Sequence, residues 1–432
     1  MNRALKYKVI FCVLLLAGTG YGQREWTRFR GPNGSGSISD ASIPTSWTDQ
    51  DYNWRIDLPG IGHSSPVIWK KRIFVTSADP ESAQRSIFCF DVDDGGQLWR
   101  KDIQSKTHGQ HPSSSYADAT PAVDQDGVIV SWTTPESYHV IAIDLTGRER
   151  WRRDLGPFVG ANGSGVSPII VDDLVLIPND QDDVQLLTRL MGNENPDAPI
   201  GKSSVIALDR GSGDIRWQLP RKTTLASYAT PCIRETQNGS KELILITEAQ
   251  GVSGVDVTTG KINWEVPGLF SARCVASPIL VKDLVVGTDG EGVNGSLLVA
   301  VKAGISGTPD ARTLAYEVKR AVPLVPTPLY HNGLLFLWAD NGIVSCVDGK
   351  TGQVHWRERV GGNFYSSPIG VGQHVLCVAR NGEVVMLAAS TKYQLISRMP
   401  LEQTTFATPA VSDGVLYLRS ESRLHSLGGN RQ

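Results

Sequence analysis

The chain has 432 residues, 44 of them glycine, and a formal net charge of −2, a composition typical of a globular protein with many tight turns. It is neither disordered nor strongly basic, so it lacks the positive field that non-specific nucleic-acid binding requires. We therefore expect no nucleic-acid partner.

Residues 1–22 have the features of a secretory signal peptide. Three positive residues precede an apolar run over 9–18, and small residues fit cleavage after Gly22. The apolar run is shorter than the roughly 20 residues that a membrane span needs. We predict an exported, soluble protein, periplasmic or extracellular, without a transmembrane segment.

Two irregular stretches lie outside the repeats described below. Residues 23–53 form an arm rich in Gly, Pro and Ser, and the sequence leaves open whether it folds on the rest of the chain or reaches another protein. Residues 179–202 form an insertion, with one or two helical turns expected from Val184 to Met191. Long insertions on a rigid scaffold often carry specific contacts.

A small residue, a Ser or Thr and a Pro precede an apolar strand eight times. Successive prolines are 55, 47, 63, 47, 50, 40 and 41 residues apart, the length of one four-stranded propeller blade. Proline suits the start of a strand because its missing N–H costs no ladder hydrogen bond there. We predict an all-β, eight-bladed β-propeller. The copies are Ser64-Ser65-Pro66, Ala119-Thr120-Pro121, Val166-Ser167-Pro168, Ala229-Thr230-Pro231, Ala276-Ser277-Pro278, Pro326-Thr327-Pro328, Ser366-Ser367-Pro368 and Ala407-Thr408-Pro409.

A second signature, D-x-x-x-G-x-x-x-W, ends the third strand of most blades. The Asp can accept backbone N–H groups across a tight turn, and the Gly supplies a positive φ. The Trp begins the outer strand and can fill the wedge between neighbouring blades. We interpret these residues as architectural rather than catalytic. They are Asp91 and Trp99, Asp144 and Trp151 (one residue shorter), Asp209 and Trp217, Asp256 and Trp264, and Asp348 and Trp356.

Two blades depart from this second signature. The fifth offers Tyr316 where Trp is expected, and the seventh keeps neither the Asp nor the Trp. The last blade, ending near Leu427, lacks an outer strand, whereas residues 54–58 resemble an outer strand that precedes the first blade. We predict that 54–58 completes the last blade, which closes the ring over 54–427 and removes an exposed sheet edge.

Together the two signatures resemble the pyrroloquinoline-quinone (PQQ)-like propeller repeat over residues 54–427. The resemblance implies an eight-bladed ring like those of the quinoprotein dehydrogenases and of the non-enzymatic BamB propellers of the outer-membrane β-barrel assembly machinery. The arm segment from Phe29 to Gly34 is also similar to the opening of secreted PQQ-like propeller proteins of planctomycete-type bacteria.

The resemblance also raises the question of a quinone cofactor. In the dehydrogenases PQQ lies between a Trp and a disulfide of adjacent cysteines, beside a Ca²⁺ site and an Asp base. This chain has no adjacent cysteine pair and no haem-attachment motif, and it carries no common hydrolase, zinc-protease, kinase or P-loop motif. We assign no catalytic residue, no metal ligand and no cofactor. A PQQ-dependent or divergent oxidoreductase that uses the axial funnel is the alternative.

The fold predicts where a binding site would lie. Loops from each outer strand to the next inner strand converge on the axis at one face, so the residue three positions before each signature Pro is expected at the mouth of the channel. We predict a ligand site formed by His63, Asp118, Tyr228 and Tyr365, with Arg273 as a charged neighbour. The alternative is that these are ordinary loop residues.

Three other residue groups receive a structural interpretation. His108 and His111 could bind a metal with a third ligand, but a solvent-exposed pair is the simpler interpretation. The acidic residues 180–183 lack the Gly and Glu of an EF-hand and are interpreted as a solvated turn. Five cysteines follow the leader, and all but Cys274 lie in apolar strand runs; we expect buried free thiols, with one disulfide in an oxidising compartment as the alternative. The five are Cys89, Cys232, Cys274, Cys346 and Cys377.

The sequence therefore predicts a monomeric, non-catalytic, exported propeller that binds a protein or a cell-envelope component. It does not identify that partner.

Overall fold

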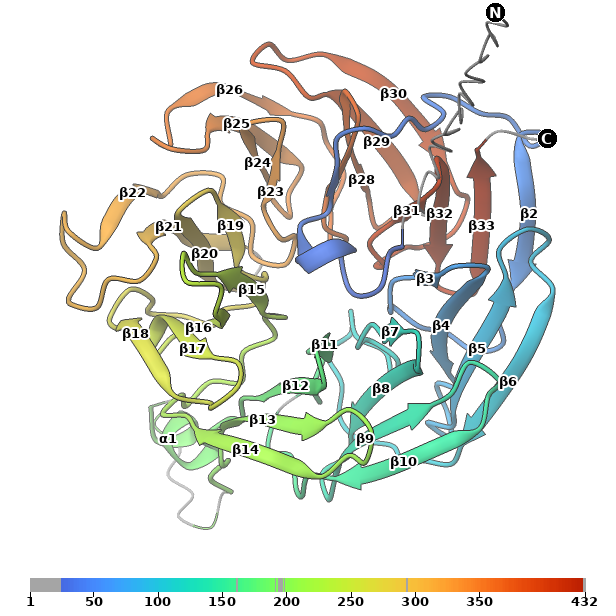
Figure 1. Ribbon diagram of the computed structural model, residues 1–432. Coiled ribbons are helices and arrows are strands. Elements are labelled where there is room, and N and C mark those ends of the chain that lie inside the picture. Colours follow the sequence, from blue (N-terminus) through green and yellow to red (C-terminus); the bar gives the residue numbers. More distant parts are fainter. Residues whose placement is uncertain are drawn as a thin grey trace, which may run out of the picture.

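The computed structural model describes residues 25–160, 162–190, 192, 197, 199–292 and 294–429. Eight antiparallel sheets surround a central axis, each with a short inner strand and an outer strand at the rim (Figure 1). The predicted all-β, eight-bladed propeller is confirmed, with four-stranded blades and almost no helix. The predicted signal peptide over 1–22 lies outside the described residues.

The first four blades follow one another along the chain, and each inner strand begins directly after its signature proline. The strands are, in blade 1, β3 (Val67–Trp69), β4 (Arg72–Ala78), β5 (Arg85–Asp91) and β6 (Gln97–Ile103); in blade 2, β7 (Ala122–Asp124), β8 (Gly127–Thr133), β9 (Tyr138–Ile143) and β10 (Glu149–Asp154); in blade 3, β11 (Ile169–Val171), β12 (Leu174–Asn179), β13 (Ser204–Asp209) and β14 (Ile215–Pro220); and in blade 4, β15 (Cys232–Glu235), β16 (Lys241–Thr247), β17 (Gly251–Asp256) and β18 (Ile262–Val266).

Blades 5 to 8 repeat this order, except that the outer strand of blade 8 comes from the other end of the chain. The strands are, in blade 5, β19 (Ile279–Val281), β20 (Leu284–Glu291), β21 (Asn294–Lys302) and β22 (Leu314–Val318); in blade 6, β23 (Leu329–His331), β24 (Leu334–Trp338), β25 (Ile343–Asp348) and β26 (Val354–Arg359); in blade 7, β27 (Ile369–Val371), β28 (His374–Val378), β29 (Glu383–Ala388) and β30 (Leu395–Pro400); and in blade 8, β31 (Ala410–Ser412), β32 (Val415–Ser420), β33 (Arg423–Gly428) and β2 (Tyr52–Asp57).

The closure of the ring is as predicted, with a small shift in its bounds. Strand β2 pairs antiparallel with β33, and Trp54 lies opposite Ser426. The strand begins at Tyr52, two residues before the predicted start, and ends at Asp57. A strand near the start of the chain, β2, is therefore the last strand of the ring.

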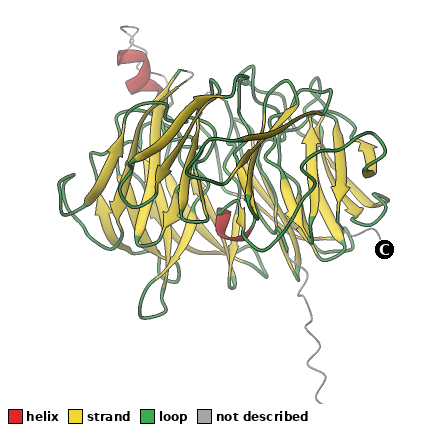
Figure 2. Ribbon diagram, turned by 90° about the horizontal axis from the view of Figure 1, so that it is seen from above, coloured by secondary structure: helices red, strands yellow, loops and turns green. Residues whose placement is uncertain are grey.

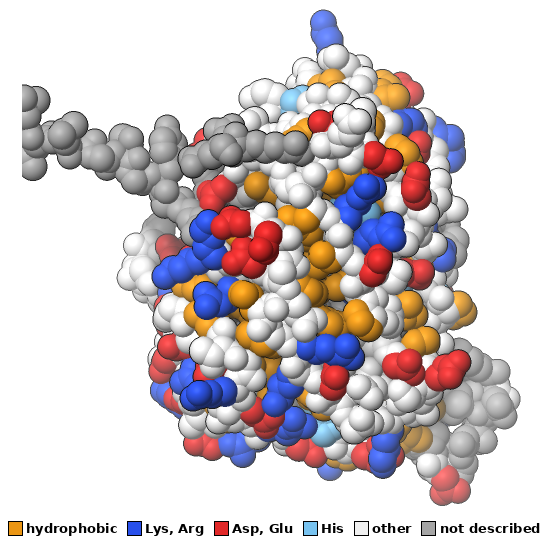
Figure 3. Space-filling view, turned by 90° about the vertical axis from the view of Figure 1, so that its right-hand side faces the viewer, with side chains coloured by type: hydrophobic (Ala, Val, Ile, Leu, Met, Phe, Trp, Pro, Cys, Tyr) orange, Lys and Arg blue, Asp and Glu red, His pale blue; other side chains and the backbone are white. Residues whose placement is uncertain are grey.

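The strands differ in composition from the axis to the rim. The middle strands of a blade are almost entirely buried, as in β8, whereas outer strands such as β10 are mostly exposed and charged, with only Trp151 buried. The rim accordingly carries Lys, Arg, Asp and Glu side chains interspersed with apolar ones (Figure 3). Charged side chains on an outer strand oppose edge-to-edge pairing with another sheet.

A closed ring of hydrogen bonds joins the eight blades around the axis. The backbone N–H of the Ser or Thr in each signature donates to the hydroxyl of the corresponding Ser or Thr in the next blade, and the last blade donates to the first. The donor–acceptor distances are 2.9 Å for Ser65 to Thr120, 3.0 Å for Thr120 to Ser167, 3.2 Å for Ser167 to Thr230, 3.0 Å for Thr230 to Ser277, 3.0 Å for Ser277 to Thr327, 3.0 Å for Thr327 to Ser367, 2.9 Å for Ser367 to Thr408 and 3.1 Å for Thr408 to Ser65.

Tryptophans of the outer strands join neighbouring blades near the rim. Trp151 donates its indole N–H to the carbonyl of Arg210 in the next blade at 3.0 Å, and Gly213 of the same turn lies against its ring. A Cβ at Gly213 would lie 2.6 Å from Trp151 Cε3, and φ there is +75°, so both space and backbone require glycine. Tyr316 takes the same position in blade 5, where its hydroxyl donates to Gly349 O at 2.9 Å. The equivalent indole bonds come from Trp54, Trp99, Trp217 and Trp356.

Trp264 is the exception among these tryptophans. Its indole N–H donates to Glu242 Oε2 within its own blade, at 3.0 Å. The next blade is the fifth, which lacks the Asp-to-Gly turn that supplies the backbone acceptor to Trp54, Trp99, Trp151 and Trp217. Blade 7 lacks that turn too, but Trp356 donates there to Ser390 O. The signature aspartates build those turns: Asp144 Oδ1, for example, accepts the N–H groups of Thr146 at 2.8 Å and Arg148 at 3.0 Å.

The N-terminal arm folds into the channel instead of extending from the ring. Trp26 pairs with Ile68 of blade 1, and β1 (Ser37–Ile38) pairs parallel with β27 as a fifth strand of blade 7. Between them the 3₁₀ turn η1 (Pro32–Gly34), blue in Figure 1, lies inside the ring. Asn33 exchanges two hydrogen bonds of 2.7 Å with the backbone of Ile233 in blade 4.

The arm then covers the junction of blades 7 and 8. Ile43 and Trp47 are buried in one apolar cluster with strands of blades 7, 8 and 1. Pro44 lies against Gly428 at the end of β33. Blade 7 lacks the outer-strand Trp of the signature, and in blade 8 the adjacent strands β33 and β2 come from opposite ends of the chain. The arm supplies apolar contacts at this junction that the repeat does not supply.

Within the described residues, no helix is long and apolar enough to cross a membrane.

The hydroxyl ring predicts a specific mutational effect. We expect Thr230→Val to destabilise the protein by about 1–3 kcal/mol, because the buried N–H of Ser167 then has no acceptor. Thr230→Ser keeps the acceptor and is the matched control. The urea midpoints of the two variants check this, and equal midpoints would contradict a structural role for the ring.

Candidate functional site

The axial channel opens at the face on which helix α1 (Val184–Leu190) lies, which we call the upper face (Figure 2). A cavity of about 660 Å³ occupies the mouth of the channel there. Below it a narrower chamber of about 160 Å³ is lined by all eight hydroxyl residues of the ring and contacts Phe29 of the arm. The channel is therefore a funnel, and the arm forms the floor of its narrow end.

The structure brings the five predicted site residues together. His63, Asp118, Tyr228, Arg273 and Tyr365 all line the cavity at the mouth. So do the other residues three positions before the signature prolines, which are Gly165, Val275, Val325 and Phe406. Binding of a ligand by these residues stays a prediction.

His63 lies between two carboxylates at the wall of the funnel. Its Nδ1 is 3.1 Å from Asp118 Oδ1, and its Nε2 is 3.9 Å from Glu421 Oε1. Burial acts to lower the pKa of His63, but the neighbouring carboxylates of Asp118 and Glu421 outweigh it, so its pKa is raised above 6.5. Asp118 is itself fixed by the backbone N–H and hydroxyl of Ser115, at 2.8 and 2.7 Å.

An aromatic arc continues from His63 along one side of the mouth. The His63 ring stacks on Phe406 with centroids 4.1 Å apart, and Tyr365 meets Phe406 edge to face at 5.7 Å. Arg380 lies over both rings, 5.0 Å from Tyr365 and 5.1 Å from Phe406. Three aromatic faces and a cation thus form one wall.

A polar arc lies across the mouth and depends on the insertion. Asp182 accepts the N–H of Ala226 at 2.7 Å and forms an ion pair with Arg273 at 3.1 Å. The Arg273 guanidinium lies 5.6 Å from the Tyr228 ring centroid. The Tyr228 hydroxyl is enclosed near Asn162 without a hydrogen bond of normal geometry, and its pKa is raised, mainly by burial.

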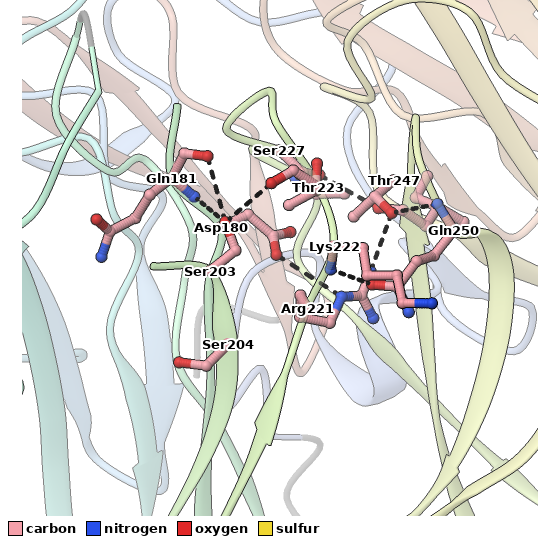
Figure 4. A network of polar contacts seen from close by, with 12 residues as sticks. Asp180, Gln181, Ser203, Ser204, Arg221, Lys222, Thr223, Ser227, Thr247 and Gln250 are labelled. Atoms are coloured by element: carbon pink, nitrogen blue, oxygen red, sulfur yellow. Dashed lines mark hydrogen bonds and ion pairs between the residues drawn. The ribbon is translucent and has the colours of Figure 1, made fainter. Parts of the chain in front are cut away.

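The solvated turn expected at residues 180–183 is wrong. Asp180, Gln181 and Asp182 are buried, because this part of the insertion folds back onto the ring: the N–H of Asp182 donates to Val159 O, and that of Asp183 donates to Thr224 O. Asp180 lies 3.8 Å from Arg221, which also donates to the Thr247 hydroxyl at 3.1 Å (Figure 4). Burial raises the pKa of Asp180 to about 6, while Arg221 lowers it. This network fixes the base of the wall that holds Arg273.

Several lining residues were not found from the sequence. Leu187 of α1, Leu225 and the β20–β21 hairpin tip at Glu291 all reach the cavity. The inserted length of blade 3 and the long β20 and β21 strands are the sequence signals that could have placed them. Phe29 carries no such signal, because the arm has no repeat and no periodicity.

The other sequence candidates do not form a metal site. His111 lies exposed at the edge of the cavity, and His108 packs edge to face against Tyr116. Among the described residues, no group of three or more His, Cys, Asp or Glu side chains could hold a metal ion. The five cysteines are buried and unpaired, and none lines the mouth.

The lining residues do not fit the quinone site that the PQQ-like resemblance implies. Within the described part of the chain, no Trp side chain and no cysteine lines either the mouth or the chamber, and the floor is Phe29. The planar cofactor would lack both faces of the sandwich described for the dehydrogenases. We therefore derive no oxidation step at this site.

Comparisons with known proteins agree with the fold. The family model described as outer membrane protein assembly factor BamB matches residues 46–203 and 319–427. The search of curated proteins found no match. The solved structure of BamB from Moraxella catarrhalis is similar, with 14% identity, coverage of 88% of this chain and 97% of that chain, and a TM-score of 0.59.

Two further solved structures share the propeller. Quinohemoprotein alcohol dehydrogenase from Comamonas testosteroni has 11% identity and a TM-score of 0.68, and the match covers 95% of this chain and 81% of that chain. The computationally designed Ika8 protein has 14% identity and a TM-score of 0.54, with 86% and 98% covered. At these identities the structural likenesses show the fold alone.

The environment of His63 predicts a pH-dependent stability. Because its folded-state pKa is raised, its contribution is present below its unfolded pKa of about 6.5 and is lost as pH rises through the folded value. We expect Asp118→Asn to lower the His63 pKa in an NMR titration. The variant should lose more stability at pH 5.5 than at pH 9 in urea unfolding.

Asp126→Asn is the matched control, since Asp126 is an exposed turn residue remote from the funnel. Equal losses for Asp118→Asn at both pH values would show that the His63–Asp118 contact does not set the titration.

Proposed function

This chain belongs to the family of the outer membrane protein assembly factor BamB, and we propose that it is a non-catalytic, exported propeller that binds a protein or cell-envelope component at the mouth of its funnel. The geometry of the mouth carries this proposal. All eight blades contribute to the cavity, and its walls combine aromatic, apolar and charged side chains on a rigid ring.

The cavity suits an inserted segment better than a flat surface. A volume of about 660 Å³ lies within the range of small-molecule and peptide pockets. The aromatic arc offers rigid rings with little conformational entropy to lose, and the Arg273–Asp182 pair offers both signs of charge beside it. We propose that a partner inserts a short chain segment, whose end enters the funnel.

The narrow end supports binding rather than passage. Phe29 contacts the chamber from below, and the arm is held by hydrogen bonds to several inner strands. A bound segment therefore enters and leaves by the mouth. We further propose that the protein acts as a monomer in the periplasm or outside the cell.

In-cell photo-crosslinking tests the location of the site. We expect a phenylalanine-derived photo-crosslinker in place of Tyr365 to form a covalent adduct with an envelope component. The same group in place of Leu98, a half-exposed residue on the outer strand β6, is the control and should form none. No adduct at Tyr365, or equal adducts at both positions, would contradict binding at the mouth.

Affinity for the captured component then tests the side chains. Tyr228→Ala and Tyr365→Ala should each weaken binding about tenfold or more, as expected for aromatic anchors, whereas Leu98→Ala should not change it. Circular dichroism melts verify that the variants are folded. As a check on the oxidoreductase alternative, PQQ with Ca²⁺ should produce neither a large rise in Tm nor dye-linked oxidation of alcohols or sugars; a large rise with turnover would overturn the non-catalytic proposal.

A further inference from the structure

The hydroxyl ring has unused hydrogen-bond donors. Each of its eight hydroxyls accepts a backbone N–H, and none donates a hydrogen bond to another group in the part of the chain that the structure describes. All eight residues line the narrow chamber. A hydroxyl that accepts one hydrogen bond is polarised and becomes a better donor. The chamber is therefore surrounded by groups suited to an acceptor.

Two buried guanidinium groups lie beside the chamber. Arg28 and Arg30 flank Phe29 in the arm and are 7% and 0% exposed. Arg28 donates to Pro231 O, and Arg30 donates to Pro328 O at 3.0 Å and to Pro368 O at 3.3 Å.

These contacts place positive charge next to the ring. Each of those prolines directly follows a ring residue, so both guanidinium groups are held one residue away from Thr230, Thr327 and Ser367. On the opposite side Arg419, 1% exposed, donates to the carbonyl of Ser64, the neighbour of Ser65, at 2.9 Å.

The charges of Arg28 and Arg30 lack counter-ions. Among the described residues, neither forms an ion pair with a carboxylate, and Arg28 Nε, Arg30 Nε and Arg30 Nη1 are buried without a hydrogen-bond partner. Burial lowers the pKa of Arg28 to about 10 and that of Arg30 to about 9, so both remain charged at neutral pH. An uncompensated buried charge is costly, and an anion nearby offsets that cost.

The carboxylates at the mouth do not supply this counter-charge. Asp118 lines both the cavity and the chamber, but its carboxylate is already engaged by His63 and by the N–H and hydroxyl of Ser115. Asp182 contacts Arg273 in the wider cavity above the ring. The chamber of about 160 Å³ has room for a carboxylate or phosphate group with a few waters, since a water occupies about 30 Å³ in the liquid.

We propose that the narrow end of the funnel binds the anionic group of a ligand, a carboxylate or a phosphate, which the ring hydroxyls hold by hydrogen bonds beside the arm arginines. The apolar or aromatic body of that ligand lies in the cavity above, against Val275, Val325 and Phe406. The inference deepens the proposed function because it defines the chemistry of the end that enters the funnel first.

The anion site is testable without a ligand. Phe29→Glu places a carboxylate at the floor of the chamber, and Phe29→Gln is the isosteric neutral control. At pH 8 we expect Phe29→Glu to melt about 2 °C or more above Phe29→Gln, because its carboxylate takes the place of the anion. The site would depress the pKa of that Glu, so the difference should persist down to its unfolded pKa of about 4.3 and vanish as pH falls below its folded pKa. A lower Tm for Phe29→Glu at pH 8 would overturn the proposal.

A ligand-binding experiment on the unaltered protein tests the proposed anion site independently, even if the Phe29 variants fail to fold. In calorimetric titrations at constant ionic strength, sodium hexanoate should bind at 1:1 stoichiometry and at least tenfold more tightly than hexanamide, its neutral analogue. Acetate and inorganic phosphate test the anionic group alone and distinguish a carboxylate from a phosphate. Equal affinities for hexanoate and hexanamide would overturn the proposal.

The variants then locate the bound anion. Phe29→Glu should abolish hexanoate binding, whereas Phe29→Gln should retain it, and retention by both would place the ligand elsewhere. The outcome is separable from that of the proposed function: crosslinking at Tyr365 reports the partner at the mouth, whereas the Phe29 pair reports the chamber. Either proposal can therefore fail while the other holds.

Discussion

Each blade of this propeller contributes one backbone N–H that has no partner within its own sheet, at the residue before the proline. The hydroxyl of the next blade accepts it, so the eight innermost strands are joined by side chains instead of by sheet hydrogen bonds. This explains why the position is Ser or Thr in every copy. The side-chain hydroxyl accepts the N–H of the preceding blade, while the backbone N–H of the same residue donates to the hydroxyl of the following blade. The ring sets the width of the channel, and the channel determines where the mouth, the chamber and the arm can lie.

Near the rim, a second contact has the opposite polarity. There the indole N–H of a Trp donates to a backbone carbonyl of the following blade, and a glycine of that blade leaves space for the indole ring. The two contacts together fix both the radius of each blade and its rotation. Where the outer-strand Trp is missing, another side chain is present: Tyr316 in blade 5, and Pro44 with Trp47 from the arm at the junction of blades 7 and 8. At the junction of blades 4 and 5, Trp264 bonds within its own blade instead.

Most of the fold and part of the site could be predicted because the repeat links sequence spacing to position in space. Eight prolines place eight inner strands, and counting back three residues places His63 and Tyr228 at one cavity. The arm could not be placed in this way, since Arg30 and Asn33 bind backbone groups some 200 to 340 residues away and leave no periodic pattern. The acidic residues 180–183 were misjudged for the same reason: Asp182 is buried by a partner, Arg273, that is distant in the chain.

The path of the chain has a consequence for how the protein reaches its native state. The arm contacts blades 1, 2, 4, 6, 7 and 8, and the next segment is the outer strand of blade 8. The segments synthesised first thus need the segments synthesised last as partners for their native contacts. An open solenoid gains stability one repeat at a time, but here single blades can form early while closure waits for the complete chain. A shortened chain should consequently lose the whole cooperative structure, not one blade of it.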